Sequence, residues 1–324
     1  MRKRRERLSD IGELEAIRRL TRGLVRGSGV VVGPGDDCAV VAPGRRCRTH
    51  WLLTSDPIIE RVHFTADARP ESIGHKAVGR ILSDLAAMGG EPDWALIDLV
   101  APGGTAASRL ERIYDGAARL ADRYGLSLVG GDLAEGLRLE LHVFGVGHLP
   151  AGSALLRSGA RENDAIYVTG RLGGSSTGRH LTFEPRVPQG LWLRTKGWAR
   201  AMIDISDGLA TDLRHILDMS GVGAELDLAR IPIAPAARRI KGGKTPLDHA
   251  LYDGEDFELL FTVAPDRERT FASAWRRKFD LPCTRIGRIT GSPSTLAVID
   301  ASGGSRIIAR SGYEHFVRGK KVAT

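Results

Sequence analysis

The sequence predicts two α+β domains, the first over residues 1–150 and the second over residues 151–324. A chain of 324 residues is long enough for two domains that each bury their own core. Both halves mix helical patterns with strand patterns, and the strand patterns are too short and too irregular for one doubly wound parallel sheet. The segment Pro150-Ala151-Gly152-Ser153 is rich in turn-forming residues and marks the boundary.

In the first half, apolar residues at helical spacing predict an amphipathic helix over residues 11–26. A longer helix over 71–89 ends at Gly89-Gly90, because glycine commonly terminates helices. A third helix is expected over 105–124. The expected strands of this half span residues 37–42, 49–54, 93–100, 126–129 and 138–148.

The second half begins with the strand pattern Ala165-Ile166-Tyr167-Val168-Thr169 and a glycine- and serine-rich loop over 170–178. Its expected helices span residues 188–199, 209–219 and 266–279. Its further expected strands span residues 201–204, 223–228, 257–263, 285–289, 295–299 and 306–309.

Composition excludes several classes of protein. The net charge of +8 comes mostly from scattered arginines, and aromatic residues make up only 6%, so no nucleic-acid partner is expected. Three distant cysteines form neither a disulfide framework nor a Cys-x-x-Cys metal pair, which favours a reducing cytoplasm. No run of 18 apolar residues occurs, so we expect no membrane partner.

Acidic turns are the main chemical signal. Gly33-Pro34-Gly35-Asp36-Asp37 puts two carboxylates on a tight turn, and four further turns repeat the pattern of Asp beside Gly or Ser at Ser55-Asp56, Ser83-Asp84, Gly131-Asp132 and Asp204-x-Ser206-Asp207. Carboxylates that converge repel one another unless a cation joins them, and Mg²⁺ with nucleotide phosphates is the simplest cation. The alternative is a set of independent turns and helix caps, with Asp207 capping the helix that follows it.

Other candidate residues are less specific. Arg157-Ser158-Gly159 offers a guanidinium group beside backbone N–H groups and could hold a phosphate, or be an ordinary surface segment. The loop Gly173–Gly178 lacks the Lys-Ser/Thr ending of a P-loop, so it is a flexible loop as readily as a site. His63 stands between Val62 and Phe64, where a packed histidine is commoner than a ligand.

Motifs along nearly the whole chain resemble those of the thiamine-monophosphate kinase family, part of the aminoimidazole-ribonucleotide synthetase superfamily. They are Gly-x-Gly-Asp-Asp-Cys-Ala (33–39), Ser-Asp (55–56), Val-His-Phe (62–64), Leu-Ser-Asp-Leu-Ala-Ala-Met-Gly (82–89), Gly-Gly-Asp (130–132), Arg-Ser-Gly-Ala-Arg (157–161), Ile-Asp-Ile-Ser-Asp-Gly-Leu (203–209), Gly-Glu-Asp-Phe-Glu-Leu-Leu-Phe (254–261) and Gly-Tyr-Glu-His-Phe (312–316). The resemblance implies that superfamily's two-domain fold and a homodimer whose N-terminal mixed sheets form a β-barrel. It also implies Mg²⁺-dependent transfer of a phosphoryl group from ATP to thiamine monophosphate, which gives thiamine diphosphate.

The resemblance also assigns residues to roles. It implies that Asp207, Asp37 and Arg157 act directly in the transfer. The implied nucleotide contacts are Gly131, Asp132, Arg157 and Ser206, and the implied contacts to thiamine monophosphate are His63, Glu255 and the aromatic Tyr313. The implied metal ligands are Asp37, Thr54, Ser55, Asp56, Asp84, Asp132, Asp204 and Asp207.

The chain departs from the family pattern at Pro57, Arg61 and Leu133, where Thr, Gly and Thr are usual, and in the short segment around Arg179, where the family usually has another helix. Two alternatives therefore stay open. One is another ATP-using enzyme of the superfamily with a different acceptor. The other is a nucleotide-binding relative that has lost phosphoryl transfer.

Overall fold

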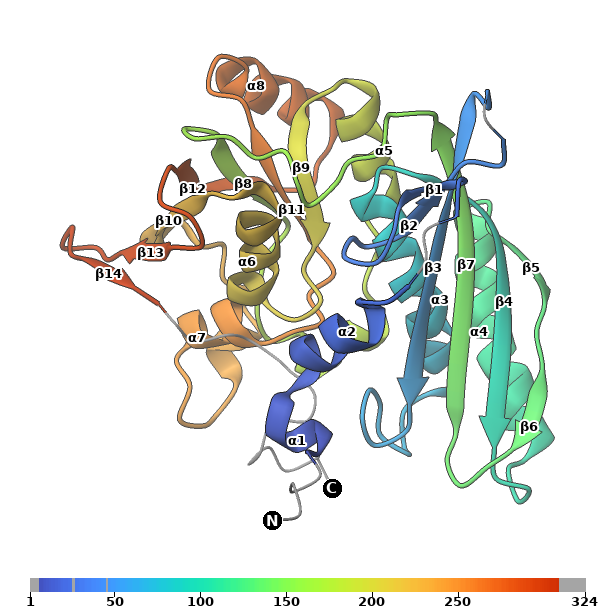
Figure 1. Ribbon diagram of the computed structural model, residues 1–324. Coiled ribbons are helices and arrows are strands. Elements are labelled where there is room, and N and C mark those ends of the chain that lie inside the picture. The colour runs from blue at the N-terminus through green and yellow to red at the C-terminus, as the bar shows by residue number, and fades with distance from the viewer. Residues whose placement is uncertain (1–5, 25–26, 45, 309–324) are drawn as a thin grey trace, which may run out of the picture.

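The computed structural model describes residues 6–24, 27–44 and 46–308. Two seven-stranded sheets lie side by side in this part of the chain, and helices pack between and around them (Figure 1). The chain completes the first sheet before it enters the second, so each sheet belongs to one half of the sequence. None of the described helices combines the length and apolar character that a membrane crossing requires.

The first sheet has the strand order β1-β2-β3-β7-β4-β5, and β6 pairs with β4. Neighbours are antiparallel except that β4 runs parallel to β5 and β6, so the sheet is mixed. Its strands are β1 (Val30–Val32), β2 (Ala39–Val41), β3 (Thr49–Ile59), β4 (Glu91–Ala101), β5 (Ser127–Gly130), β6 (Leu133–Glu135) and β7 (Glu140–Pro150).

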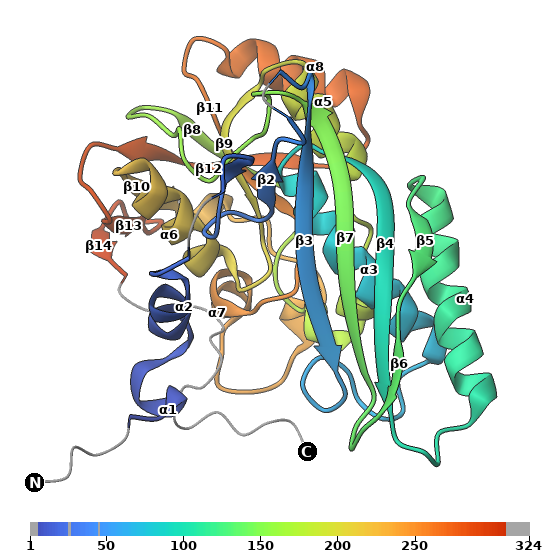
Figure 2. The same cartoon turned by 45° about the vertical axis from the view of Figure 1, so that its right-hand side comes forward.

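Helices α3 (Pro70–Ala87) and α4 (Ala107–Arg123) cover one face of this sheet (Figure 2). They approach closely because glycines face the contact. A Cβ atom on Gly74 would lie 1.9 Å from the carbonyl oxygen of Ile113, and one on Gly116 would lie 2.0 Å from that of Glu71. A side chain at either position would therefore force the two helices apart.

The second sheet has the order β14-β13-β10-β12-β8-β11-β9. Strand β8 is buried on both faces, because Ala165 and Tyr167 pack into one hydrophobic cluster while Ile166 and Val168 pack into another. Its strands are β8 (Ala165–Thr169), β9 (Ala199–Asp204), β10 (Gly223–Asp227), β11 (Leu259–Val263), β12 (Cys283–Thr290), β13 (Leu296–Ile299) and β14 (Ser305–Ile307). The remaining α-helices are α1 (Leu8–Ile11), α2 (Glu13–Thr21), α5 (Val187–Thr195), α6 (Leu209–Ser220), α7 (Pro246–Tyr252) and α8 (Glu268–Lys278).

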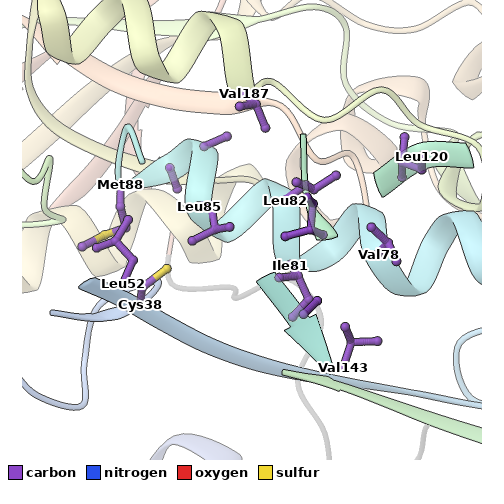
Figure 3. Close-up of a cluster of buried hydrophobic side chains, with 14 of the residues drawn as sticks. Cys38, Leu52, Val78, Ile81, Leu82, Leu85, Met88, Leu120, Val143 and Val187 are labelled. Atoms are coloured by element: carbon purple, nitrogen blue, oxygen red, sulfur yellow. The ribbon is translucent and has the colours of Figure 1, made fainter. Parts of the chain in front are cut away.

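Helix α3 is the element that joins the two halves. It contacts β3 and β7 of the first sheet and also β9 and α5 of the second half. Ile81 of α3 points toward Val143 of β7, while Val187 of α5 lies on the other side of the helix (Figure 3). Because α3 is enclosed on both sides, its polar residues are held inside the protein, where the two halves meet.

Several predicted elements have different limits in the structure. The helix predicted over 11–26 is broken at Gly12, which has a φ of 76°, into the short α1 and α2. Strand β3 continues to Ile59, so Ser55-Asp56 lies inside a strand rather than at its end. Helix α7 was not predicted, although its N-terminus carries a capping box in which Thr245 and Asp248 bond reciprocally.

Candidate active site

Three carboxylates from separate elements converge where the two halves meet. Asp37 lies on the glycine turn before β2, Asp84 in the last turn of α3 and Asp204 at the end of β9. Each offers an oxygen atom, and these atoms all lie within 4.8 Å of one another. We call Asp37, Asp84 and Asp204 the carboxylate cluster. These three acidic residues are therefore not independent turns or helix caps, because the fold brings them together.

Few positive charges compensate the carboxylate cluster. An Arg157 guanidinium nitrogen lies 2.7 Å from Asp37 Oδ1. The hydroxyl of Thr54 donates to Asp84, and Ser83 Oγ donates to Asp204 Oδ2 over 2.5 Å. Asp37 Oδ2 is buried and has no hydrogen-bond partner among the described residues. The cluster thus has one guanidinium for three carboxylates, together with an oxygen left for a further ligand.

Burial and mutual repulsion raise the pKa values of these groups. Burial raises the pKa of Asp37, and the nearby Arg157 opposes this effect. Burial and then the carboxylates of Asp204, Asp56 and Asp37 raise the pKa of Asp84 well above its usual value. The pKa of Asp204 rises to about 7, mainly through burial and then through Asp37. Three such groups need protons or a cation at neutral pH, and oxygen ligands at this spacing fit Mg²⁺.

Asp56 lies beside the carboxylate cluster but is already paired. Arg80 of α3 forms a two-armed ion pair with it, with Nε 2.5 Å from Oδ2 and a terminal nitrogen 2.6 Å from Oδ1. Its charge still contributes to the raised pKa values of Asp84 and Asp204. Arg80 lies outside the acidic motifs, and the sequence analysis did not single it out.

A cavity of about 330 Å³ opens beside these groups. It brings together four of the residues that the sequence analysis singled out, namely His63, Ser206, Asp207 and Glu255. Arg80 links this cavity to the acidic groups, because it lines the cavity and pairs with Asp56. We call this space the central cavity; its other lining residues are Val62, Ser176, Lys244, Tyr252, Asp253 and Gly254.

Asp207 does not cap the helix that follows it. The N-cap position of α6 is Gly208, and no side chain makes a cap hydrogen bond there. The backbone N–H of Asp207 donates to Asp212 Oδ2 over 3.1 Å. Asp212 is buried, and burial together with the charges of Asp207 and Asp204 raises its pKa well above its usual value. Asp212 adds another carboxylate near the site, and sequence reasoning did not single it out.

Four of the singled-out residues are not among those that the structure brings together here. Gly131 and Asp132 are exposed in the connection between β5 and β6, and Gly131 has a φ of 147° where a Cβ atom would meet the carbonyl oxygen of Ile97 at 1.9 Å. The side chain of Ser55 is exposed on the opposite face of β3 from Thr54, because successive strand residues alternate. Tyr313 lies outside the described residues.

Comparison with known proteins identifies the family. The family models for the N-terminal and C-terminal domains of AIR synthase related proteins match residues 35–149 and 184–299. A thiamine-monophosphate kinase of Rhodopirellula baltica is 40% identical over 273 residues, which cover 81% of this chain and 84% of that protein. The Escherichia coli K12 enzyme of the same name is 36% identical over 312 residues, 89% of this chain and 92% of that protein. The chain belongs to the thiamine-monophosphate kinase family.

A solved structure supports the same assignment. It is described as AaThiL complexed with AMPPCP and TMP, it is 32% identical, and it superposes with a TM-score of 0.83 over 97% of this chain and 100% of that one. The two-domain α+β fold of AIR synthase related proteins is thus established for this chain.

Two departures from the family's usual pattern now have a structural account. Pro57 lies within β3, opposite His142 of β7. On the other side of β3, β2 pairs only with Trp51–Leu53, so the part of β3 that contains Pro57 has one described neighbouring strand. A strand position with a neighbour on one side only tolerates a residue without an N–H group. Arg61 has a φ of 67°, in the left-handed region that glycine adopts at no steric cost. Arg61 thus adopts a conformation that is open to glycine, at a cost on the order of 1 kcal/mol for a residue with a side chain.

The short segment around Arg179 is a 3₁₀ turn, Arg179–Leu181, tied to a buried charge network. Arg179 forms an ion pair with Glu258 and donates to the carbonyl oxygen of Arg171 over 2.8 Å. Arg186 holds the same carboxylate, with its nitrogens 2.6 and 2.7 Å from Glu258. Two guanidinium groups thus anchor this segment to the residue just before β11.

Proposed function

We propose that this protein transfers the γ-phosphoryl group of ATP to thiamine monophosphate and so produces thiamine diphosphate and ADP. The carboxylate cluster beside the central cavity carries this proposal, because its converging oxygen atoms suit a divalent cation and the neighbouring cavity suits a small substrate. Membership of the thiamine-monophosphate kinase family supplies the reaction and the acceptor.

The chemistry needs no general base. A phosphate monoester has its second pKa at about 6, so the acceptor is already mostly a dianion at neutral pH. The barrier lies in bringing two polyanions together, and bound Mg²⁺ supplies charge neutralisation there. We propose that Asp37, Asp84 and Asp204 hold the metal, with Asp56, Asp207 and the Thr54 hydroxyl around them.

We also propose roles for the walls of the central cavity. Glu255 presents a carboxylate for the cationic thiazolium ring, and His63 lines the same space. Tyr313 would supply an aromatic face for that cation, since aromatic rings attract cations. Arg157 would exchange part of its contact with Asp37 for nucleotide phosphate, and Ser206, Gly131 and Asp132 would contact the nucleotide.

We further propose that the protein is a homodimer joined through the open face of the first sheet, as in the β-barrel that the family resemblance implies. Trp94, Leu96 and Phe144 are 43%, 39% and 38% exposed on this face. The adjacent strand residues Ala95, Ile97, Val143 and Gly145 are buried. An apolar sheet face of this kind is typical of a surface that a partner covers.

Light scattering should give the mass of a dimer for the wild type and of a monomer for Phe144→Glu. A monomeric wild type would contradict this proposal.

A cytoplasmic location completes the proposal. Cys38, Cys47 and Cys283 are free thiols in the structure, and free thiols persist in reducing compartments.

A direct assay tests the proposed function. Purified protein with ATP, Mg²⁺ and thiamine monophosphate should produce thiamine diphosphate, and EDTA should abolish this product. Asp207→Asn should nearly abolish turnover while thermal unfolding stays cooperative, because the change removes a charge and keeps the size of the side chain. Bound ATP without product would contradict the proposal and favour a relative with another acceptor or without transfer. Wild-type turnover in Asp207→Asn would contradict the role of that residue.

A further inference from the structure

Lys76 is a charged residue with no exposure to solvent. It lies on α3, its relative exposure is 0%, and it heads the set of large side chains that are fully buried among the described residues. Lysine is almost never fully buried unless its ammonium group is paired. The partners of Lys76 therefore indicate why the chain keeps a charge there.

The two partners that the structure shows for Lys76 belong to residues that line the central cavity. Its Nζ atom lies 2.5 Å from Oε1 of Glu255 and donates a hydrogen bond of 2.6 Å to the main-chain carbonyl of His63. His63 precedes α3 in the first half of the chain, while Glu255 lies between α7 and β11 in the second half. One buried ammonium group thus holds two walls of the cavity that come from different domains.

The Glu255 side chain is only partly covered by this contact. Its Oε1 atom is buried, yet 29% of the side chain is exposed, so the open part is the part that Lys76 does not hold. The backbone is fixed separately, because the N–H of Glu255 donates to the carbonyl of Ser206 over 2.7 Å. Glu255 also has a φ of 64°, a left-handed conformation that costs a non-glycine residue energy and occurs mainly at functional sites.

We propose that Lys76 is a positioning residue that fixes the Glu255 carboxylate, and with it the His63 turn, for the cationic ring of thiamine monophosphate. This inference rests on the proposed function and adds to it a residue that no substrate atom touches. Arg80 also approaches Glu255, at 3.7 Å, but its guanidinium group is engaged by Asp56. Lys76 is therefore the cation closer to Glu255, and unlike Arg80 it is not paired with Asp56.

The charge of Lys76 is compatible with this role near neutral pH. Burial lowers its pKa to about 8, while the carboxylate of Glu255 opposes that change. Arg80 disfavours the ammonium form and Asp56 favours it. Burial, and then the nearby charge of Lys76, lower the pKa of His180. At neutral pH Lys76 is therefore mostly an ammonium group, which can hold the Glu255 side chain in place beside a cationic ring.

Binding measurements on single and double variants test the inference. Calorimetry in Mg²⁺ buffer should show that Lys76→Met weakens thiamine monophosphate binding about 10- to 100-fold, the range for one lost charged hydrogen bond. Binding of the ATP analogue AMPPCP should change less than about twofold. The double variant Lys76→Met/Glu255→Gln should bind thiamine monophosphate no more weakly than Glu255→Gln alone, because the two residues act as one unit.

The control is Lys278→Met, which removes an exposed lysine from the end of α8 and should leave both affinities unchanged. Equal losses for both ligands, or losses that simply add in the double variant, would overturn the inference and leave Lys76 with a purely structural role. If Lys76→Met does not fold, the double variant, which removes both charges together, takes its place. Its affinity for thiamine monophosphate, compared with that of Glu255→Gln, then decides whether the two residues act as one unit. Wild-type binding without turnover would instead contradict the proposed function and leave the Lys76 result interpretable.

Discussion

Asp84→Asn is expected to lower phosphoryl transfer on the order of 10³-fold while making the metal-free protein more stable at pH 7.5. The loss of activity follows because a metal ligand disappears, and metal stabilisation of transferring phosphate is worth several kcal/mol, at 1.36 kcal/mol for each factor of ten. The gain in stability follows because Asp84 lies in a desolvated site near the carboxylates of Asp204, Asp56 and Asp37, and it forms no ion pair of its own among the described residues. An asparagine keeps the bond from Thr54 and removes the repulsion.

The pH dependence of stability has a definite sign. The pKa values of Asp36 and Asp204 rise to about 7 from 3.8, and burial raises that of Asp84 well above its usual value. Between about pH 4 and pH 7 the folded state therefore binds more protons than the unfolded state. As far as these groups are concerned, the stability of the metal-free protein should be greatest below about pH 4 and should fall as the pH rises from there to about 7. Mg²⁺ should reverse the fall, by about 2.7 kcal/mol at 100 times its dissociation constant.

Thermal unfolding with and without Mg²⁺, at pH 5.5 and pH 7.5, checks these expectations. Wild type should gain more from Mg²⁺ at pH 7.5, and Asp84→Asn should lose most of that gain. Asp122→Asn, on the exposed face of α4, is the matched control and should behave as the wild type does. A variant Asp84→Asn that is less stable than wild type without metal would show that the carboxylate is compensated in a way that the structure does not display.

The carboxylate cluster was accessible from the sequence because each member stands in a short motif at the end of an element. Asp37, Asp84 and Asp204 come together through turns and helix ends, where a polar residue beside glycine or serine stands out. Lys76 and Arg80 were not accessible in this way. They lie in a helix that packs between the two halves of the protein. A single sequence does not reveal that the second half covers the face of this helix that would otherwise be exposed.

The mixture of helix and strand patterns in the sequence predicted the fold class. It did not predict strand limits and residue exposures that depend on pairing with neighbouring strands. Ser55-Asp56-Pro57 is typical of a turn, and β3 continues through it because pairing with β7 extends from Thr49 to Ile59. The face to which Ser55 points depends on that continuation. Exposure of Asp132 depends in turn on where β5 ends and β6 begins, which short strands define poorly in sequence. Tertiary pairing, not local propensity, decides these positions.

Arg157→Met is expected to destabilise the metal-free protein by about 3–5 kcal/mol, the usual cost of leaving a buried charge without its partner. The side chain of Asp37 is 2% exposed and that of Arg157 is 19% exposed, so solvent does little to replace the lost contact. The backbone N–H of Arg157, which donates to Asp36, remains in the variant. The effect therefore reports on the guanidinium group alone. It should shrink as the pH is lowered, because burial raises the pKa of Asp37 and the variant removes the arginine that opposes this change.

A matched variant makes this prediction decisive. Arg123→Met also removes the arginine of an ion pair with a carboxylate, that of Glu184, but those side chains are 52% and 46% exposed. Exposed pairs contribute about 0–1 kcal/mol, so urea unfolding should show little change in this control. The turnover of Arg157→Met should also fall by about 10²-fold, which is the usual effect of removing one hydrogen-bond donor that stabilises charge in the transition state. Saturating Mg²⁺ should restore the stability of this variant more than its turnover. Equal stability losses in the two variants, or full recovery of turnover with Mg²⁺, would mean that Arg157 only balances the charge of Asp37 and takes no part in phosphoryl transfer.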